Sequence, residues 1–305
     1  MGQAGAGIKE LVMISVMGAT GHVGGEIARR LVKSGQKVRA LGRSREKLGA
    51  VEGAEAVAGD ASDAAYLTNA FRGADAVFTL LPPDLHSADY RALQDGQGEA
   101  IVKAVRDAGV RYVVLLSSVG ADQPSGTGPI AGLHAQEERL RVLRDTNVLA
   151  LRPGYFFENF YGSLPVIKHQ GVLGDAVGPE VALPMIATRD IAAAASEALL
   201  ARDWRGFVVR ELLGPRDLTH AEAARIIGGK IGRPDLPYVQ LPYEDMTGAL
   251  VGAGLSPSVS SLYVEMSRAF NEGLVRSVEG RNASNTTPTR FEDFATELAR
   301  AYQAM

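Results

Sequence analysis

The sequence predicts an α/β protein with a doubly wound parallel sheet and a smaller, interleaved α/β domain. In its first half, short β-rich runs alternate strictly with helix-like stretches, and this order is typical of βαβ units in a parallel sheet covered on both faces. The right-handed crossover rule then gives a doubly wound sheet. A glycine-rich turn, GATGHVG at residues 18–24, directly follows the first β-rich run.

Six β-rich runs are expected to form the strands of this sheet: Leu11–Met17, Lys37–Gly42, Ala54–Gly59, Ala74–Leu81, Arg111–Ser118 and Val148–Arg152. Four helix-like stretches lie between them: Gly24–Ser34, Ser62–Phe71, Ser87–Ala108 and Leu133–Asp145. The second half reads as a smaller α/β region that includes one helical stretch over 243–273. We therefore expect a large domain over residues 11–155, to which 190–213 returns, and a smaller substrate domain over 156–305.

Composition narrows the classes of function. The 305 residues are 46% hydrophobic and 22% charged, a globular balance, and the net charge of −3 gives no reason to expect binding to nucleic acid or to an anionic membrane. The absence of cysteine excludes disulfides and thiolate sites, and we expect no metal site. No apolar stretch reaches the roughly 18 residues of a membrane span. A cytoplasmic protein with a flexible N-terminal tail over residues 1–10 is expected.

The turn after the first strand is interpreted as a phosphate-binding loop, because the N–H groups and the dipole at a helix N-terminus attract phosphate. Gly18 permits the tight turn, Gly21 lets the backbone approach a pyrophosphate, and Gly24 allows close packing of helix on strand. The spacing is G-x-x-G-x-x-G instead of G-x-G-x-x-G, so a plain glycine turn is the alternative. The remaining residues assigned to the loop are Thr20, His22 and Val23.

The end of the second strand favours NADP(H) over NAD(H). An acidic residue there would bind the ribose 2′-hydroxyl of NAD, whereas this chain has Arg43, whose guanidinium suits a 2′-phosphate. Arg45 and Lys47 follow closely, and either one can assist Arg43 or lie in solvent. The large domain is accordingly predicted to bind NADP(H).

Four motifs together resemble the NmrA-like family, a branch of the atypical short-chain dehydrogenase/reductase superfamily. They are GATGHVGG at 18–25, LLPP at 80–83, YVVLLSSVGA at 112–121 and LRPGYFFENF at 151–160. The resemblance extends to NTTPTRFEDFA at 285–295 and covers nearly the whole chain beyond residue 10. It implies a Rossmann fold and an NADP(H) site. The family contains quinone oxidoreductases and triphenylmethane-dye reductases, but also NADP-binding regulators.

Further cofactor contacts are expected where the strands of the sheet end. Asp60 resembles the family's aspartate beside the adenine, although it can instead belong to the N-cap of the next helix. Residues after the fourth, fifth and sixth strands are assigned to the ribose and nicotinamide, with core packing or local backbone hydrogen bonds as their alternatives. These residues are Leu80, Leu81, Pro82, Ser117, Ser118, Pro153, Tyr155 and Phe156. An aromatic run from Phe156 to Tyr161 forms either a pocket for a flat substrate or part of the core.

The acid–base pair of ordinary short-chain dehydrogenases, Tyr-x-x-x-Lys, is missing, because no tyrosine lies between Tyr112 and Tyr155. His134 lies eighteen residues before Arg152, where relatives often carry Lys or His, and is the candidate catalytic residue; the alternative is a histidine that caps or packs the helix start. It is also expected to contact the cofactor.

Two functions from different classes follow. A quinone or another conjugated acceptor takes up hydride into its own π-system and needs positioning more than it needs an acid. The first hypothesis is therefore an NADPH-dependent oxidoreductase that acts on a small conjugated substrate. The second is a non-catalytic NADP(H)-sensing regulator that acts through a protein partner. A weaker third hypothesis is an epimerase or dehydratase. A homodimer is compatible with each of the three hypotheses.

Overall fold

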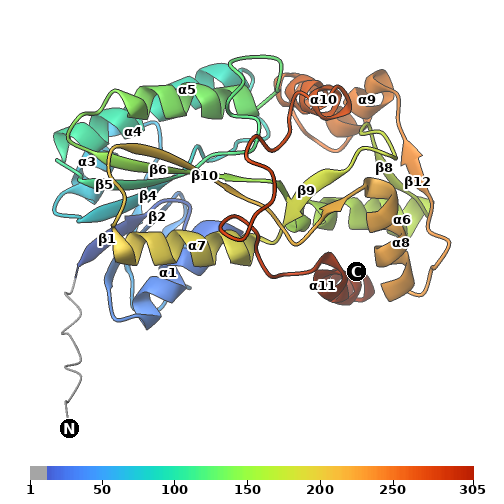
Figure 1. Ribbon diagram of the computed structural model, residues 1–305, viewed down its shortest axis with the longest axis horizontal. Coiled ribbons are helices and arrows are strands. Elements are labelled where there is room, and N and C mark those ends of the chain that lie inside the picture. Colours follow the sequence, from blue (N-terminus) through green and yellow to red (C-terminus); the bar gives the residue numbers. More distant parts are fainter. Residues whose placement is uncertain (1–11) are drawn as a thin grey trace, which may run out of the picture.

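The computed structural model describes residues 12–305, so the expected N-terminal tail lies outside the described residues (Figure 1). A seven-stranded, entirely parallel sheet with the order β10-β6-β5-β4-β1-β2-β3 forms the centre of the larger region. Its strands are β1 (Met13–Val16), β2 (Lys37–Gly42), β3 (Glu55–Ala58), β4 (Ala76–Thr79), β5 (Tyr112–Leu116), β6 (Asn147–Pro153) and β10 (Phe207–Leu212). The predicted doubly wound sheet is confirmed.

Helices cover both faces of this sheet. On one face, α1 (His22–Lys33) packs against α7 (Thr188–Ala201); on the other lie α3 (Ala64–Phe71), α4 (Tyr90–Asp107) and α5 (Ile130–Arg141) (Figure 1). A short helix, α2 (Arg45–Leu48), follows β2. Each face has its own apolar core, and the strands, buried on both sides, read as the nearly continuous apolar runs expected for a parallel sheet.

The order of the strands reverses between β1 and β4, which are neighbours in the sheet. Val16 pairs with Ala40 on one side and with Phe78 on the other, so the carboxyl ends of these strands lie at the same edge. In open α/β sheets, ligands bind in the crevice at this switch point.

The smaller region lies at the carboxyl end of the sheet (Figure 1). It contains two small sheets, ordered β11-β9-β7 and β12-β8, around a third apolar core that includes Phe157, Phe160 and Phe291. Its strands are β7 (Tyr155–Phe156), β8 (Leu173–Asp175), β9 (Leu183–Ile186), β11 (Asp217–Leu218) and β12 (Tyr238–Gln240). Its helices are η1 (Phe157–Ser163), α6 (Leu164–Gln170), α8 (His220–Lys230), α9 (Tyr243–Gly252), α10 (Pro257–Asn271) and α11 (Phe291–Ala304).

The two regions are interleaved along the chain. After entering the smaller region at β7, the chain returns to the larger one through α7, which packs on α1, and through β10, which pairs with β6 over six residues. The chain then re-enters the smaller region at β11.

The expected single helix over 243–273 is wrong, because α9 and α10 are separate helices. Ser256 caps α10 with its hydroxyl, and Pro257 occupies the first turn, where its missing N–H costs no hydrogen bond. The connecting segment is tied to the loop after β4: Ser256 donates its backbone N–H to Leu85 O (2.9 Å) and its hydroxyl to Ser87 O (2.6 Å), and His86 Nδ1 lies 3.0 Å from Gly254 O.

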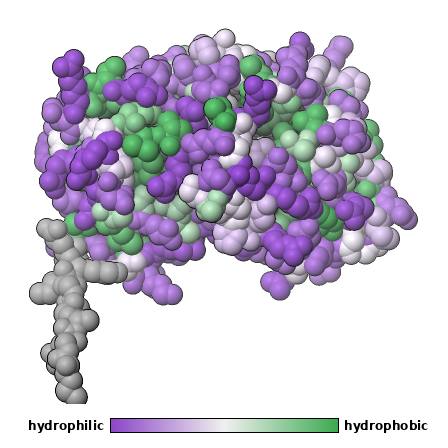
Figure 2. Space-filling view, in the orientation of Figure 1, coloured by the Kyte–Doolittle hydropathy of each residue, from purple (hydrophilic) through white to green (hydrophobic). Residues whose placement is uncertain are grey.

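Hydrophilic side chains predominate on the face shown in Figure 2, where apolar residues form only small, separate groups. Val142 and Val278 are the most exposed of the large apolar side chains within residues 12–305, at 72% and 65%. No helix in the part of the chain that the structure describes is both long and apolar enough to cross a membrane.

Candidate functional site

Backbone conformation and packing explain two of the three glycines in the turn between β1 and α1. Gly18 has a φ of +65°, and a Cβ there would lie 2.6 Å from Leu80 Cδ2. A Cβ on Gly24 would lie 2.6 Å from Met17 O and closer still to Gly18 O, so only glycine lets α1 pack this tightly on β1. Gly21 differs, because its φ is −99° and a Cβ would approach no atom closer than Gly18 O at 3.4 Å. The fold itself therefore does not require glycine at residue 21.

The N-terminus of α1 is suited to an anion. Gly21 is its N-cap, so within the described structure no side chain caps the helix, and its first turn carries no acidic residue. Thr20, Gly21 and His22 are exposed, whereas Val23 is buried in the core. Unpaired N–H groups and the helix dipole together attract negative charge at such an end.

Arg43 and Asp60 lie at the same edge of the sheet, after β2 and β3. Arg43 is exposed and takes part in no ion pair or hydrogen bond among residues 12–305. The neighbouring Gly42 lies against Thr20, which brings the two turns together. Asp60 is exposed and accepts a hydrogen bond from Ser62 N at 2.7 Å.

The N-cap of α3 is not Asp60. Asp63 caps this helix by accepting hydrogen bonds from Ala65 N (2.9 Å) and Tyr66 N (3.0 Å). Asp60 instead closes a tight local turn, and its second carboxylate oxygen accepts no hydrogen bond from any residue within 12–305. Its assignment beside the adenine remains a prediction.

The residues after β4 divide by burial. Leu80 is half-buried and packs onto Gly18, while Leu81 is buried in the core, so core packing applies to Leu81. Pro82 is half-buried and accepts a hydrogen bond from Gln97 Nε2 at 3.0 Å. Leu80 and Pro82 thus line the edge of the sheet beside the glycine turn.

Ser117 and Ser118, after β5, have different partners. Ser118 Oγ donates to Val119 O at 2.8 Å, the local backbone bond considered as its alternative. Ser117 is buried and donates instead to Glu137 Oε1 at 2.5 Å. Glu137 also binds Arg152 through two hydrogen bonds, of 2.9 Å from Nε and 2.6 Å from Nη2. No pattern along the sequence predicted this buried cluster.

The Arg152 guanidinium remains charged. Burial alone would lower its pKa, but Glu137, Asp122 and Glu211 outweigh burial and raise it above its usual range. The nearest contact to Asp122 is 4.0 Å, from Nη1 to Oδ1. Carboxylates from α5, from the loop after β5 and from β10 therefore all stabilise this positive charge.

His134 lies in the second turn of α5, because this helix begins at Ile130 and not at Leu133 as expected. It is half-buried, and its Nδ1 lies 2.9 Å from Ala121 O, in the loop after β5. A carbonyl oxygen can only accept, so Nδ1 carries the proton and Nε2 is the nitrogen left for a ligand. This position within the helix excludes a capping histidine, and the catalytic role of His134 remains a prediction beside the alternative of a packing role.

The aromatic run after β6 belongs mostly to the core. Phe157 and Phe160 are 1% exposed and pack against Phe291, so both side chains belong to the apolar core of the smaller region. Pro153 is buried and Phe156 half-buried, both beside the sheet, and the Phe156 side chain packs against the core under α1. Tyr161 of η1 lies parallel to the ring of His22, with centroids 6.5 Å apart, and links the smaller region to the glycine turn.

Tyr155 contacts the buried His220, with ring centroids 5.3 Å apart. Burial is the main cause that raises the pKa of the Tyr155 phenol far above its usual range, and the charge of Asp175 adds to it. Tyr155 is therefore a neutral phenol at physiological pH and cannot replace the phenolate base of an ordinary short-chain dehydrogenase.

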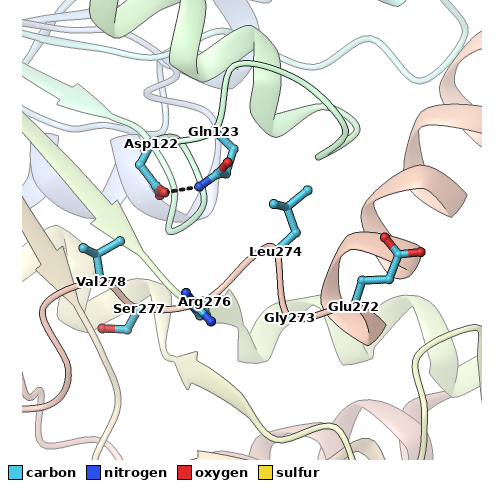
Figure 3. A pocket seen from close by; sticks show the side chains of 8 residues that line it. All are labelled: Asp122, Gln123, Glu272, Gly273, Leu274, Arg276, Ser277 and Val278. Atoms are coloured by element: carbon cyan, nitrogen blue, oxygen red, sulfur yellow. Dashed lines mark hydrogen bonds between the residues drawn. The ribbon is translucent and has the colours of Figure 1, made fainter.

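A cavity of about 510 Å³ opens beside the loop after β5 (Figure 3). One wall carries Asp122 and Gln123, whose amide donates to the Asp122 carboxylate at 2.6 Å, and the other is the segment 272–278 after α10. The volume is within the range of small-molecule sites. The lining residues are Asp122, Gln123, Glu272, Gly273, Leu274, Arg276, Ser277 and Val278. No group of three or more His, Asp or Glu residues within 12–305 is arranged to hold a metal ion.

The fold and the glycine turn define the class: a Rossmann-type α/β protein with a second α/β region at the carboxyl ends of its strands. Residues 11–295 match the NmrA-like family, and the chain belongs to this family. The resemblance seen in the sequence motifs is thereby confirmed.

Two relatives extend over almost the whole chain. A (4-alkanoyl-5-oxo-2,5-dihydrofuran-3-yl)methyl phosphate reductase from Streptomyces griseus is 32% identical over 297 residues, which cover 95% of this chain and 99% of the relative. An NAD(P)H azoreductase from Xenophilus azovorans is 29% identical over 303 residues, covering 96% and 100%.

Solved structures share the fold. An NADPH-dependent quinone oxidoreductase from Escherichia coli, in complex with NADPH, and a triphenylmethane reductase from Citrobacter sp., in complex with NADP(H), each superpose with a TM-score of 0.79. Each is 23% identical and covers 94% of this chain and 99% of its own. The predicted fold class is confirmed by these likenesses.

Proposed function

We propose that the protein is an NADPH-dependent oxidoreductase that transfers hydride to a small conjugated acceptor such as a quinone. The observation that carries this proposal is Gly21, a glycine that neither backbone conformation nor packing requires, at the uncapped N-terminus of α1. A ligand that approaches the backbone at this point gives a physical reason for the missing side chain. The names of the relatives, which are reductases, favour an enzyme over a regulator.

The residues present fit NADP(H). The N-terminus of α1 would hold the pyrophosphate, and the exposed Arg43 would bind the 2′-phosphate through its guanidinium fork. Leu80 and Pro82 would line the path of the adenosine ribose. The nicotinamide end would then reach the carboxyl ends of β5 and β6, beside His134.

When bound, NADPH supplies the hydride; the chain supplies position and, where needed, a proton. His134 is oriented by Ala121 O, and its Nε2 is the atom that would face cofactor or acceptor. Because neutral Nε2 lacks a proton, His134 can donate one there only as the imidazolium. An acceptor whose π-system takes up the electrons does not need that proton in the hydride step.

The cavity beside Asp122 is the proposed place of the acceptor. Asp122 directly follows Ala121, the residue that holds His134, and lies 4.0 Å from Arg152. The polar residues that line the cavity, among them Gln123 and Arg276, would suit an acceptor that carries carbonyl or other polar substituents around a conjugated ring.

The test is a single-turnover assay of NADPH oxidation against a panel of quinones, azo dyes and conjugated lactones, preceded by titration with NADPH and NADH. We expect tighter binding of NADPH and oxidation by at least one acceptor. Tight binding of NADPH without oxidation by any acceptor would contradict the enzyme proposal.

A further inference from the structure

Glu137 and Arg152 form a buried ion pair beneath the nicotinamide end of the proposed site. Their side chains are 1% and 10% exposed, and the contact is bidentate. Every other ion pair within residues 12–305 has at least one side chain more than a fifth exposed. Ser117 Oγ supplies a third hydrogen bond to the same carboxylate.

A contribution to the stability of the fold does not by itself explain why the chain carries such a buried ion pair. Removing two charges from water costs several kcal/mol per ion, and apolar side chains of similar volume often serve a core equally well or better. Buried hydrogen bonds between elements do, however, fix the relative positions of the elements that they join.

The three elements joined here meet at the reacting end. Ser117 follows β5, Glu137 lies in α5 and Arg152 belongs to β6. His134 precedes Glu137 by one turn of α5, so the two side chains share one side of that helix. Pro153, a predicted nicotinamide contact, directly follows Arg152.

We propose that Glu137 is a positioning residue for the reaction: through Arg152 and Ser117 it fixes α5, and with it His134, against the carboxyl ends of β5 and β6. The inference rests on the proposed function. A shift of His134 by about 1 Å would lower the rate of hydride transfer by up to about a hundredfold without removing any cofactor contact.

The experiment compares Glu137→Gln and Glu137→Asp with Glu138→Gln as a matched control. Glu138 is the next residue of the same helix, but its ion pair with Arg141 (3.0 Å) is exposed on both sides. Four quantities are measured for each variant: the thermal midpoint without cofactor, the Kd for NADPH, the fluorescence of bound NADPH, and single-turnover oxidation with an accepted quinone.

For Glu137→Gln we expect oxidation to fall about tenfold to a hundredfold, with the Kd for NADPH changed less than about threefold. The fluorescence of the bound nicotinamide should shift, because its surroundings move. Glu137→Asp, which keeps the charge, should recover part of the rate, and Glu138→Gln should match the wild type in all four measurements.

A second variant covers the case in which Glu137→Gln does not fold. Glu137→Leu combined with Arg152→Met removes both charges and should fold, since apolar replacement of a buried pair is often neutral or stabilising. Wild-type turnover in either folded variant would overturn the positioning role. If the wild type oxidises NADPH with none of the acceptors in the panel, the proposed function is refuted instead. The fluorescence comparison needs no acceptor, so it still decides whether Glu137 shapes the nicotinamide site.

Discussion

The imidazole of His134 is hydrogen-bonded through Nδ1 to the carbonyl oxygen of Ala121, at 2.9 Å. The bond joins α5 to the loop after β5, thirteen residues earlier in the chain, and it fixes the tautomer of the ring. His134 consequently has two separable properties: it holds the loop that leads to Asp122, and it presents a titratable Nε2.

Two substitutions of His134 separate these properties. His134→Ala should lower turnover about tenfold to a hundredfold and leave the affinity for NADPH nearly unchanged. His134→Asn keeps an N–H near the place of Nδ1 but no titratable group, so it should retain most of the turnover if holding the loop is what matters. Steady-state kinetics with an accepted quinone measure both. An unaffected His134→Ala variant would remove His134 from the reaction.

Arg43 is predicted to distinguish the two nicotinamide cofactors. Arg43→Glu should weaken binding of NADPH by about 1.5–3 kcal/mol and binding of NADH far less, because a charge-assisted contact is lost and repulsion is added. Arg72→Glu is the control, since Arg72 is also exposed but lies before β4, at the opposite edge of the sheet. Calorimetric titration with both cofactors measures the effect, and equal losses for NADPH and NADH would refute the assignment.

Gly21 and Gly24 should respond to added side chains in opposite ways. Gly21→Val places its Cβ no closer than 3.4 Å to any atom, an ordinary van der Waals contact with Gly18 O, and should leave the thermal midpoint nearly unchanged while abolishing NADPH binding. Gly24→Ala forces its Cβ against Gly18 and Met17 and should destabilise the fold by about 1–3 kcal/mol. Normal NADPH binding by Gly21→Val would show that this turn is not a phosphate-binding loop.

The buried side chain of His220 should make the stability of the native state depend on pH. The side chain is 1% exposed, and neither ring nitrogen has a hydrogen-bond partner within residues 12–305. Burial lowers its pKa, outweighing the opposing charge of Asp175, so the native state disfavours the proton that the unfolded chain binds below about pH 6.5. Stability should therefore be highest above that pH and fall as the pH drops below it.

The measurement for His220 is the thermal midpoint at about pH 7.5 and about pH 5.5. His220→Leu should reduce the difference between the two values, whereas His169→Leu, at an exposed residue of α6, should not. Parallel loss of stability in the wild type and in His220→Leu would assign the acid sensitivity to other groups.

Much of the larger region could be predicted from the sequence because its signals are local. Apolar runs alternate with helices, and β2 was predicted over the same residues that it occupies, Lys37–Gly42. Most other strands were predicted one or two residues too long at each end, since a run such as Ala74–Leu81 stays apolar beyond the last ladder pair. β6 instead extends one residue beyond the predicted Val148–Arg152 at each end. The predicted helix Leu133–Asp145 is displaced, because α5 occupies Ile130–Arg141.

The buried cluster under the site could not be predicted in the same way, because it depends on which side of α5 faces the sheet. One signal was present: Glu137 falls between Leu133 and Leu140 at helical spacing, inside the apolar stripe where a carboxylate needs a partner. The partner, Arg152, belongs to a different strand, and nothing local to either residue links them. Contacts between distant segments, such as that of His22 with Tyr161, likewise cannot be predicted from patterns along the chain.

The return of the chain through α7 and β10 limits how the protein can be divided. A fragment that ends at residue 155 would lack β10, which supplies the outer hydrogen-bonded neighbour of β6 over six residue pairs. It would also lack α7 and so uncover the apolar side of α1. An open strand edge beside a bare apolar surface promotes aggregation. The nucleotide-binding half therefore cannot be produced as a simple N-terminal piece, and any minimal version must splice residues 188–212 back onto it.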